Sequence, residues 1–217
     1  MKNINWSDHI LNFLAVIIGV SLAFYINEYS ETKRLQSERN DMINSFLEEL
    51  RNDRAVFTDY QIPNNKSRAS FLEKAVNASE TNLDSMAYYV RRGLGYTNYT
   101  PQNVTFNSVV SSGKLDLIED FDLRKSLSQY HTVYVQEAKL RGEGQVEFYN
   151  SNILPWLIKN SSFNDPSGTP QVTQEFINML IVYKMLINSK VSQYELIVEK
   201  GSKLDSALVA YAEYPEK

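Results

Sequence analysis

The chain has no cysteine among its 217 residues, which excludes disulfides, thiol catalysis and zinc–thiolate sites. It has only two histidines, His9 and His131, and neither belongs to an H-E-x-x-H cluster that could bind zinc. A formal net charge of −4 leaves no basic excess for binding nucleic acid. We therefore expect no metal, no cofactor and no nucleic-acid partner.

Proline and glycine are also scarce, with six and eight copies, and neither occurs between Val20 and Ile62. Such a composition favours long, uninterrupted helices. No convincing pair of alternating strand patterns is present. The expected fold class is all-α, with a helical bundle as the main domain.

The most prominent feature that is present is an apolar run from Ile10 to Ile26, with no charge between Asp8 and Glu28. A bilayer core is about 30 Å thick and takes roughly 17–25 apolar helical residues to cross. Aromatic residues that suit headgroup layers flank the run, namely Trp6, Tyr25 and Tyr29. We predict a transmembrane anchor over residues 1–27.

Two other interpretations of this run stay open. Ser21-Leu22-Ala23 could serve as the cleavage box of a secretory signal, although Lys2 is the only basic side chain before the run. A buried core helix would also be apolar. The uniform apolarity of the run favours the anchor over both.

The polar residues 28–41 should form a helical stalk, because Leu35 is the only apolar residue between Ser30 and Asp41. From Met42, apolar residues recur at helical spacing and indicate a core-facing stripe. Residues 42–217 are therefore expected to form the bundle. We expect Pro63 to end the first long helix.

Further helices are expected after this point, with interruptions at turn-forming residues. The predicted helices cover Lys66–Ala78, a segment from the cap Asn82 to Gly93, Val104–Ser112, a long pattern from Asp122, and Thr173–Tyr211. Loops are predicted at Leu94–Asn103 and Asn160–Pro170.

Ser111-Ser112-Gly113-Lys114 fits the S-x-x-K motif of penicillin-recognising enzymes. The S-D-N-like and K-T-G elements that accompany this motif are absent. We expect the protein not to be an enzyme, and a serine hydrolase that uses Ser111 or Ser112 is kept as an alternative.

Aromatic and basic residues gather around the predicted loop. A ligand patch could be formed by Tyr88, Arg91, Arg92, Tyr96 and Tyr99. A ligand-sensing domain is therefore a second alternative function. The simpler interpretation of these residues is ordinary half-buried surface.

Small residues recur every four positions within the apolar run. Ala15, Gly19 and Ala23 would share one helix face, with Asn12 one turn earlier. Small residues at this spacing let membrane helices approach closely, and an asparagine can add an interhelical hydrogen bond. The pattern predicts a parallel homodimer or small oligomer.

Two blocks resemble a family of bacterial membrane-anchored proteins classed as a domain of unknown function. One block is Asp8-His9 with Ile17–Phe24 and Asn27-Glu28, and the other is Thr105–Ser108 with Ser112–Leu115. The resemblance implies one N-terminal transmembrane helix and a helical domain outside the cytoplasm. It implies no assigned activity and therefore no catalytic residue.

The expected function is a membrane-tethered, non-enzymatic interaction or accessory module of the bacterial cell envelope. Its expected partners are the lipid bilayer, a second copy of the chain and an envelope protein complex. We expect a single pass through the inner membrane with the C-terminal domain in the periplasm. The positive-inside rule points weakly the other way, because Lys2 precedes the run whereas Lys33, Arg34 and Arg39 follow it.

Overall fold

The structure, a computed structural model, describes residues 6–160 and 172–213, with side chains from Ile10 onward. Every regular element in these two ranges is a helix, which confirms the predicted all-α class. The His9 side chain, and the predicted loop Asn160–Pro170 beyond its first residue, lie outside the described residues. The chain divides into two units, Met1–Asn44 and Ser45–Lys217, which are described separately.

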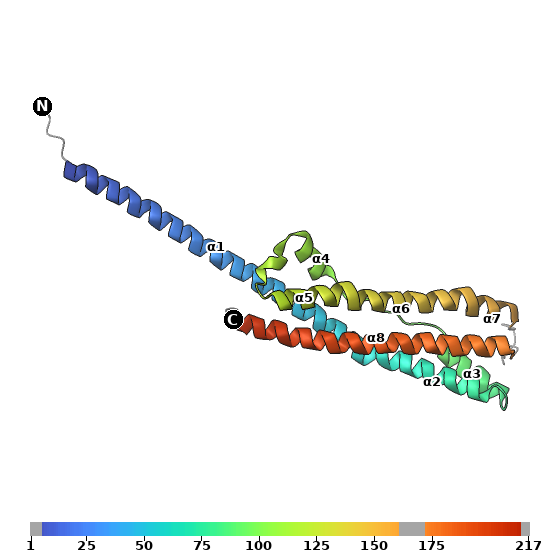
Figure 1. The fold of residues 1–217 in the computed structure, drawn as a ribbon. Helices are drawn as coiled ribbons and strands as arrows, with labels where there is room; N and C mark the ends of the chain where they lie inside the picture. The colour runs from blue at the N-terminus through green and yellow to red at the C-terminus, as the bar shows by residue number, and fades with distance from the viewer. Residues whose placement is uncertain (1–5, 161–171, 214–217) are drawn as a thin grey trace. The chain divides into compact units, whose positions relative to one another are not determined.

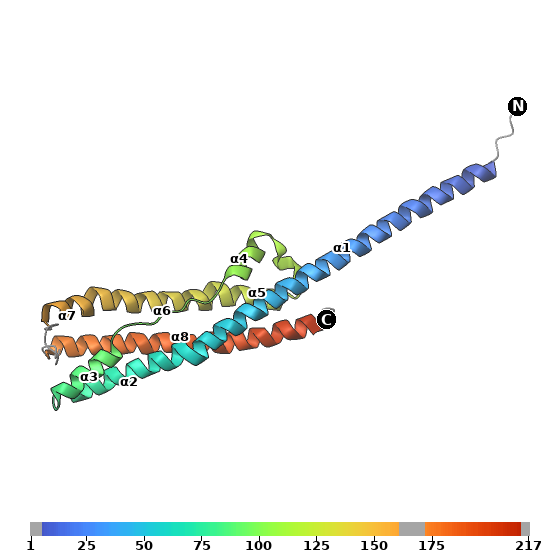
Figure 2. The same ribbon diagram turned by 180° about the vertical axis from the view of Figure 1, so that it is seen from behind.

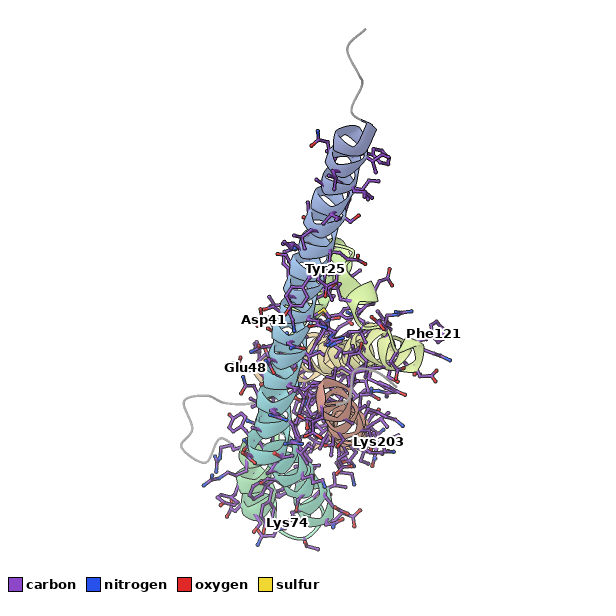
Figure 3. The ribbon with its side chains drawn as sticks, turned by 90° about the vertical axis from the view of Figure 1, so that its left-hand side faces the viewer. Tyr25, Asp41, Glu48, Lys74, Phe121 and Lys203 are labelled. Carbon is purple, nitrogen blue, oxygen red and sulfur yellow. The ribbon has the colours of Figure 1, made fainter. Side chains whose placement is uncertain are left out.

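The first unit is helical over its described length, as the first part of α1 (Trp6–Val56). Side chains surround this helix near Tyr25 in Figure 3, and the large apolar residues from Ile10 to Ile26 are all exposed. In the polar part, the Arg34 guanidinium pairs with Glu31 and Glu38. These opposite charges lie three and four residues apart, on neighbouring helical turns.

The second unit begins with the C-terminal part of α1 and is a bundle of helices. They are α2 (Ile62–Ala78), α3 (Leu83–Gly93), α4 (Val104–Ser111), α5 (Phe121–Gln129), α6 (Val135–Phe148), α7 (Leu154–Asn160) and α8 (Gln174–Glu213). Figures 1 and 2 show α8 between α2 and α6, and α3 beside α2. The predicted non-helical loop after α3 is confirmed.

The core of the bundle follows one stripe of α8. Its buried residues keep helical spacing from one end to the other, as predicted: Phe176, Leu180, Tyr183, Ile187, Tyr194, Leu204 and Leu208. Burial of apolar side chains contributes about 25 cal/mol per Å². The contacts of α8 with both α2 and α6 bury this stripe and therefore stabilise the unit.

The predicted end of the helix at Pro63 is wrong, because the helix continues through it. A wide π turn, Phe57–Gln61, precedes the proline, and the Ile62 N–H donates to the carbonyl of Phe57. Proline has no N–H and its ring crowds the carbonyl four residues earlier. A turn with i→i−5 bonds shifts these carbonyls, so Pro63 fits as the second residue of α2.

The same arrangement occurs before the second helical proline. A π turn over Tyr149–Ile153 leads into α7, and Pro155 is the second residue of that helix. A third π turn, Tyr130–Tyr134, joins α5 to α6. The helix predicted from Asp122 therefore runs on to Asn160 with two wide turns, and Pro155 does not end it.

Two predicted helix boundaries are confirmed by their local geometry. The Asn82 side chain accepts a hydrogen bond of 2.9 Å from the Ser85 N–H, which caps α3. Gly113 follows α4 with φ of +68°, a left-handed conformation that glycine adopts without strain. A 3₁₀ turn, Lys114–Leu117, follows directly.

Gly93, the last residue of α3, lies against Leu72 of α2. A Cβ built on Gly93 would lie 2.7 Å from the Leu72 Cγ and 3.1 Å from its backbone nitrogen. No side chain fits there unless the two helices separate. We expect Gly93→Ala to lower the free energy of unfolding by about 1–3 kcal/mol, the usual range for overpacking.

Gly144→Ala in α6 is the matched control, because a Cβ there meets nothing within 4 Å. Alanine favours helix by up to about 1 kcal/mol over glycine, so this variant should be neutral or more stable. Thermal unfolding of both variants, followed by circular dichroism, makes the comparison. Equal effects at the two positions would contradict the close packing at Gly93.

Candidate functional site

The apolar run is the most unusual surface of the described chain. Exposed fractions of its large apolar side chains range from 44% for Ile17 to 71% for Phe24. Among the described residues, one helix, α1, is long and apolar enough to cross a membrane by length and composition. None of the apolar stretch of membrane-spanning length is buried, so the run is not part of the protein's own core.

The predicted association face lies within this run. Asn12, Ala15, Gly19 and Ala23 are all exposed. A Cβ added at Gly19 would meet no atom within 4 Å. The helix spacing places the four residues on one side of α1, and this side is open to a partner helix.

Part of the predicted ligand patch lies on α3. Tyr88, Arg91 and Arg92 are exposed, and the Arg92 guanidinium lies 5.7 Å from the centre of the Tyr88 ring. This distance is typical of a cation–π contact. Two of the five predicted residues are thus brought together in one contact.

The other two residues of the patch lie on the non-helical segment Leu94–Asn103, which we call the strap. Tyr96 packs edge-on against Tyr149, with 5.6 Å between ring centres. Tyr99 packs edge-on against Phe57. Each tyrosine therefore has its own aromatic neighbour in the bundle, and the ligand patch stays a prediction.

The strap, drawn as a thin green trace between α3 and α4 in Figure 2, needs partners for its backbone polar groups. Lys190 of α8 supplies them, although it is fully buried. Its Nζ donates 2.8 Å to the Thr97 carbonyl and 3.0 Å to Asn98 Oδ1. A third bond goes to Gln145 Oε1. The ammonium therefore uses all three of its donors.

No carboxylate accepts from this ammonium among the described residues, since all three of its acceptors are neutral. Burial lowers the pKa of Lys190 to about 7, and the nearby charge of Arg68 acts in the same direction. An amine of this pKa could act as a base or a nucleophile. Its complete burial denies a substrate access, so the role of Lys190 here is to hold the strap.

Tyr183 adds a second attachment next to Lys190. Its hydroxyl donates 2.8 Å to the Gly95 carbonyl and accepts 2.9 Å from Gln145 Nε2. Gln145 of α6 thus joins the lysine and the tyrosine of α8. Burial raises the pKa of Tyr183, so its hydroxyl stays protonated and keeps this donor.

Asp53 of α1 holds the other end of the strap. Its carboxylate accepts 2.6 Å from the Tyr99 hydroxyl and 3.0 Å from the Gln102 N–H. Burial raises the pKa of Asp53 to about 6, against the lowering effect of these two hydrogen bonds. The strap is therefore fixed by a buried cation at its middle and a buried carboxylate near its end.

His131 lies in the π turn Tyr130–Tyr134 and contacts Asn103, the last residue of the strap. Its Nδ1 hydrogen-bonds Asn103 Oδ1, and its ring stacks on Phe106 at 4.6 Å between centres. Burial lowers the pKa of His131 to about 4, so the ring is neutral at physiological pH. This packed histidine makes a structural contact.

The predicted serine motif lies at the end of α4. The Ser112 hydroxyl donates 2.8 Å to the Ser108 carbonyl of its own helix, an ordinary contact of serine in a helix. Within the described ranges, no group of three or more histidine or carboxylate side chains is placed to bind a metal. The Ser112 hydroxyl also donates 3.2 Å to the Val109 carbonyl, so its hydrogen bonds in the described ranges go to its own helix and to no catalytic base.

Sequence reasoning missed Lys190, Asp53 and Tyr183 as the groups that fix the strap. A signal was present for Lys190, because it follows Tyr183 and Ile187 at the spacing of the apolar stripe on α8. A charged residue in such a stripe indicates a buried charge with dedicated partners. The identity of those partners depends on the path of the strap.

Comparison with known proteins found no matching family model, no similar curated protein and no similar solved structure. The family resemblance at Ile17–Phe24 and Thr105–Ser108 therefore gains no support. What holds is the coarser description: one long apolar N-terminal helix, a candidate membrane span, followed by a helical domain.

The buried lysine predicts a specific pH dependence. Between its folded pKa of about 7 and its ordinary value of 10.5, the unfolded chain binds a proton that the folded chain does not. Stability should therefore rise with pH across this window, by about 1.4 kcal/mol per unit of pKa difference as an upper bound. Lys190→Met should remove this rise, as measured by urea unfolding in detergent from pH 7 to 10.5.

Lys139→Met provides the control, because the Lys139 side chain is half exposed and forms a surface ion pair with Glu143. This variant should show the same pH dependence as the parent chain. An unchanged rise in Lys190→Met would contradict the assignment of a buried, weakly basic ammonium.

Proposed function

We propose that the chain is a membrane-tethered, non-enzymatic interaction module that belongs to the bacterial cell envelope. The observation that carries this proposal is that every large apolar side chain of the run Ile10–Ile26 is exposed. A continuous apolar surface of this kind is rare on soluble monomers and marks a membrane or protein contact. The length of the run fits a single membrane pass at the short end of the usual range.

A cleavable signal is the competing role for the same run. The helix α1 continues without a break through Ser21-Leu22-Ala23 and on to Val56. Residues beyond the cleavage box remain apolar as far as Ile26. Both features favour an anchor that is kept.

The polar groups of the bundle support a role other than catalysis. Lys190, Asp53, Tyr183 and His131 are buried groups with the chemistry of a base or a nucleophile, and each is bound to the strap. Their hydrogen bonds stabilise a fixed scaffold. A rigid helical domain on a tether suits the presentation of surfaces to a partner in an envelope complex.

We place the domain in the periplasm, with the tether in the inner membrane. Fusion of alkaline phosphatase after Tyr214 should then give activity, because that reporter folds only after export. A fluorescent protein that folds only in the cytoplasm, fused at the same position, should stay dark. The reverse pair of results would assign the domain to the cytoplasm.

We further propose that the chain associates with a second copy through its tether. Asn12, Ala15, Gly19 and Ala23 share one side of α1 and are exposed. Close approach of two helices along such a face allows backbone packing, and an asparagine pair adds about 0.6–2 kcal/mol. A face without small residues would keep the helices apart.

Gly19→Ile should weaken this association several-fold, because a large side chain separates the two helices. The open space around Gly19 means that the substitution leaves the single helix undisturbed. Recovery of one epitope-tagged copy with a differently tagged copy, after mild detergent extraction, measures the effect.

Ser21→Ile is the matched control, since Ser21 lies on the opposite side of the helix by its spacing from Gly19. It should associate as the parent chain does. Equal association of Gly19→Ile and the parent would show that the small residues face lipid. Recovery of the tagged chain alone in every case would contradict self-association altogether.

A further inference from the structure

A groove lies on the second unit where α5 and the π turn Tyr130–Tyr134 meet α8. It has a volume of about 240 Å³, below the roughly 300–1,000 Å³ of sites for drug-sized ligands. The polar side chains that line it are Ser126, Gln129, Tyr130, Tyr134, Lys200 and Lys203. Hydroxyl, amide and ammonium groups can all donate, and the lining includes no carboxylate.

Tyr130 is the most informative of these residues. Its side chain is only 2% exposed, yet its hydroxyl has no hydrogen-bond partner in the described part of the chain. The hydroxyl is not among the buried polar atoms that lack a partner, so its oxygen is accessible to the water in the groove. Burial raises the pKa of Tyr130, with the charge of Asp53 next in effect, so the hydroxyl stays protonated as a donor. A hydroxyl that lines a groove and is bound to no acceptor of the described residues can donate to a ligand.

Gly201 makes room for this hydroxyl in the middle of α8. A Cβ at this position would lie 3.3 Å from the Tyr130 oxygen and 3.4 Å from the ring carbon next to it. Glycine in a helix interior is unfavourable by about 1 kcal/mol relative to alanine. Its presence here is explained by the close approach of the tyrosine hydroxyl to the backbone of α8.

Two lysines of α8 supply positive charge beside this hydroxyl. The Lys200 ammonium lies 5.9 Å from the centre of the Tyr134 ring, which fixes it over the groove wall. Lys203, one turn later, is labelled in Figure 3 on the surface of α8. Glu199 pairs with both, at 3.8 Å to Lys200 and 2.6 Å to Lys203. Exposed pairs of this kind are weak, so both lysines can turn to a stronger anion.

We propose that this groove binds a phosphate group. A phosphate presents several acceptor oxygens and up to two negative charges, which matches a donor set from both walls of the groove. The Tyr130 hydroxyl would donate to one oxygen, and the two lysines would neutralise the charge. Leu204 and Ala207 would contact the organic part of the ligand. A free phosphorylated solute and an anionic lipid headgroup share this chemistry.

Calorimetric titration of the full chain in neutral detergent with inorganic phosphate tests the site, at constant ionic strength because charge interactions are screened by salt. The parent should show saturable binding. Tyr130→Phe should bind roughly tenfold more weakly, since a hydrogen bond to a charged group is lost. This variant removes only a hydroxyl without a partner, so its fold should be preserved. Lys200→Gln should also weaken binding several-fold.

Matched controls are available elsewhere on the bundle. Tyr88→Phe removes a hydroxyl from an exposed tyrosine, and Lys139→Gln removes a charge from a half-exposed lysine. Both should bind phosphate as the parent does. Absence of saturable binding by the parent, parent-like binding by Tyr130→Phe, or an equal loss in Lys139→Gln and Lys200→Gln would each overturn the proposal.

The two sources of phosphate are distinguished in nanodiscs of phosphatidylcholine alone and nanodiscs that also contain phosphatidylglycerol. Weaker apparent phosphate binding in the anionic discs, abolished by Tyr130→Phe, identifies a lipid headgroup as the occupant. Equal binding in both discs identifies a soluble phosphate compound. Competition by the anionic lipid that persists in Tyr130→Phe would place lipid binding elsewhere and overturn the groove as the site.

Discussion

The buried Lys190 ammonium is the interaction on which the second unit depends. A charge without an opposite charge beside it is expensive in a protein interior, and it persists only where neutral acceptors satisfy all its donors. The carbonyl of Thr97 and the amide oxygens of Asn98 and Gln145 do so here. These acceptors come from the strap and from α6, so the lysine of α8 joins three parts of the bundle.

The strap depends on buried side chains for the hydrogen bonds of its own backbone. A segment without helical hydrogen bonds must find partners for its backbone, and Asp53 and Tyr183 complete the set that Lys190 begins. The π turns rearrange the backbone hydrogen bonds within the helices, where a proline cannot donate one. They let the chain pass Pro63 and Pro155 without ending a helix, so α2 follows the first long helix and packs along α8, the helix that carries Lys190.

The polar groups of the bundle thus divide by burial into structural and surface roles. Inside the bundle, Lys190, Asp53 and Tyr183 hold the strap and are not accessible to a substrate. At the surface, the Tyr130 groove combines a tyrosine hydroxyl with two lysines whose only ion-pair partner, among the described residues, is the exposed Glu199. The apolar run of α1 has no role in the core at all. A tether and a groove for an anionic group are together consistent with a module that presents a surface at a membrane.

The sequence by itself determined the all-α class, the apolar first helix, the cap at Asn82 and the stripe of α8, because helical spacing, capping residues and long apolar runs act over short stretches of chain. Only the tertiary structure decided that the helix passes Pro63, that Lys190 is buried against the strap, and that Tyr130 meets Gly201. Each of these depends on contacts between segments far apart in the chain, or on a π turn that no local sequence pattern predicts. Their partners could therefore not be read from spacing alone.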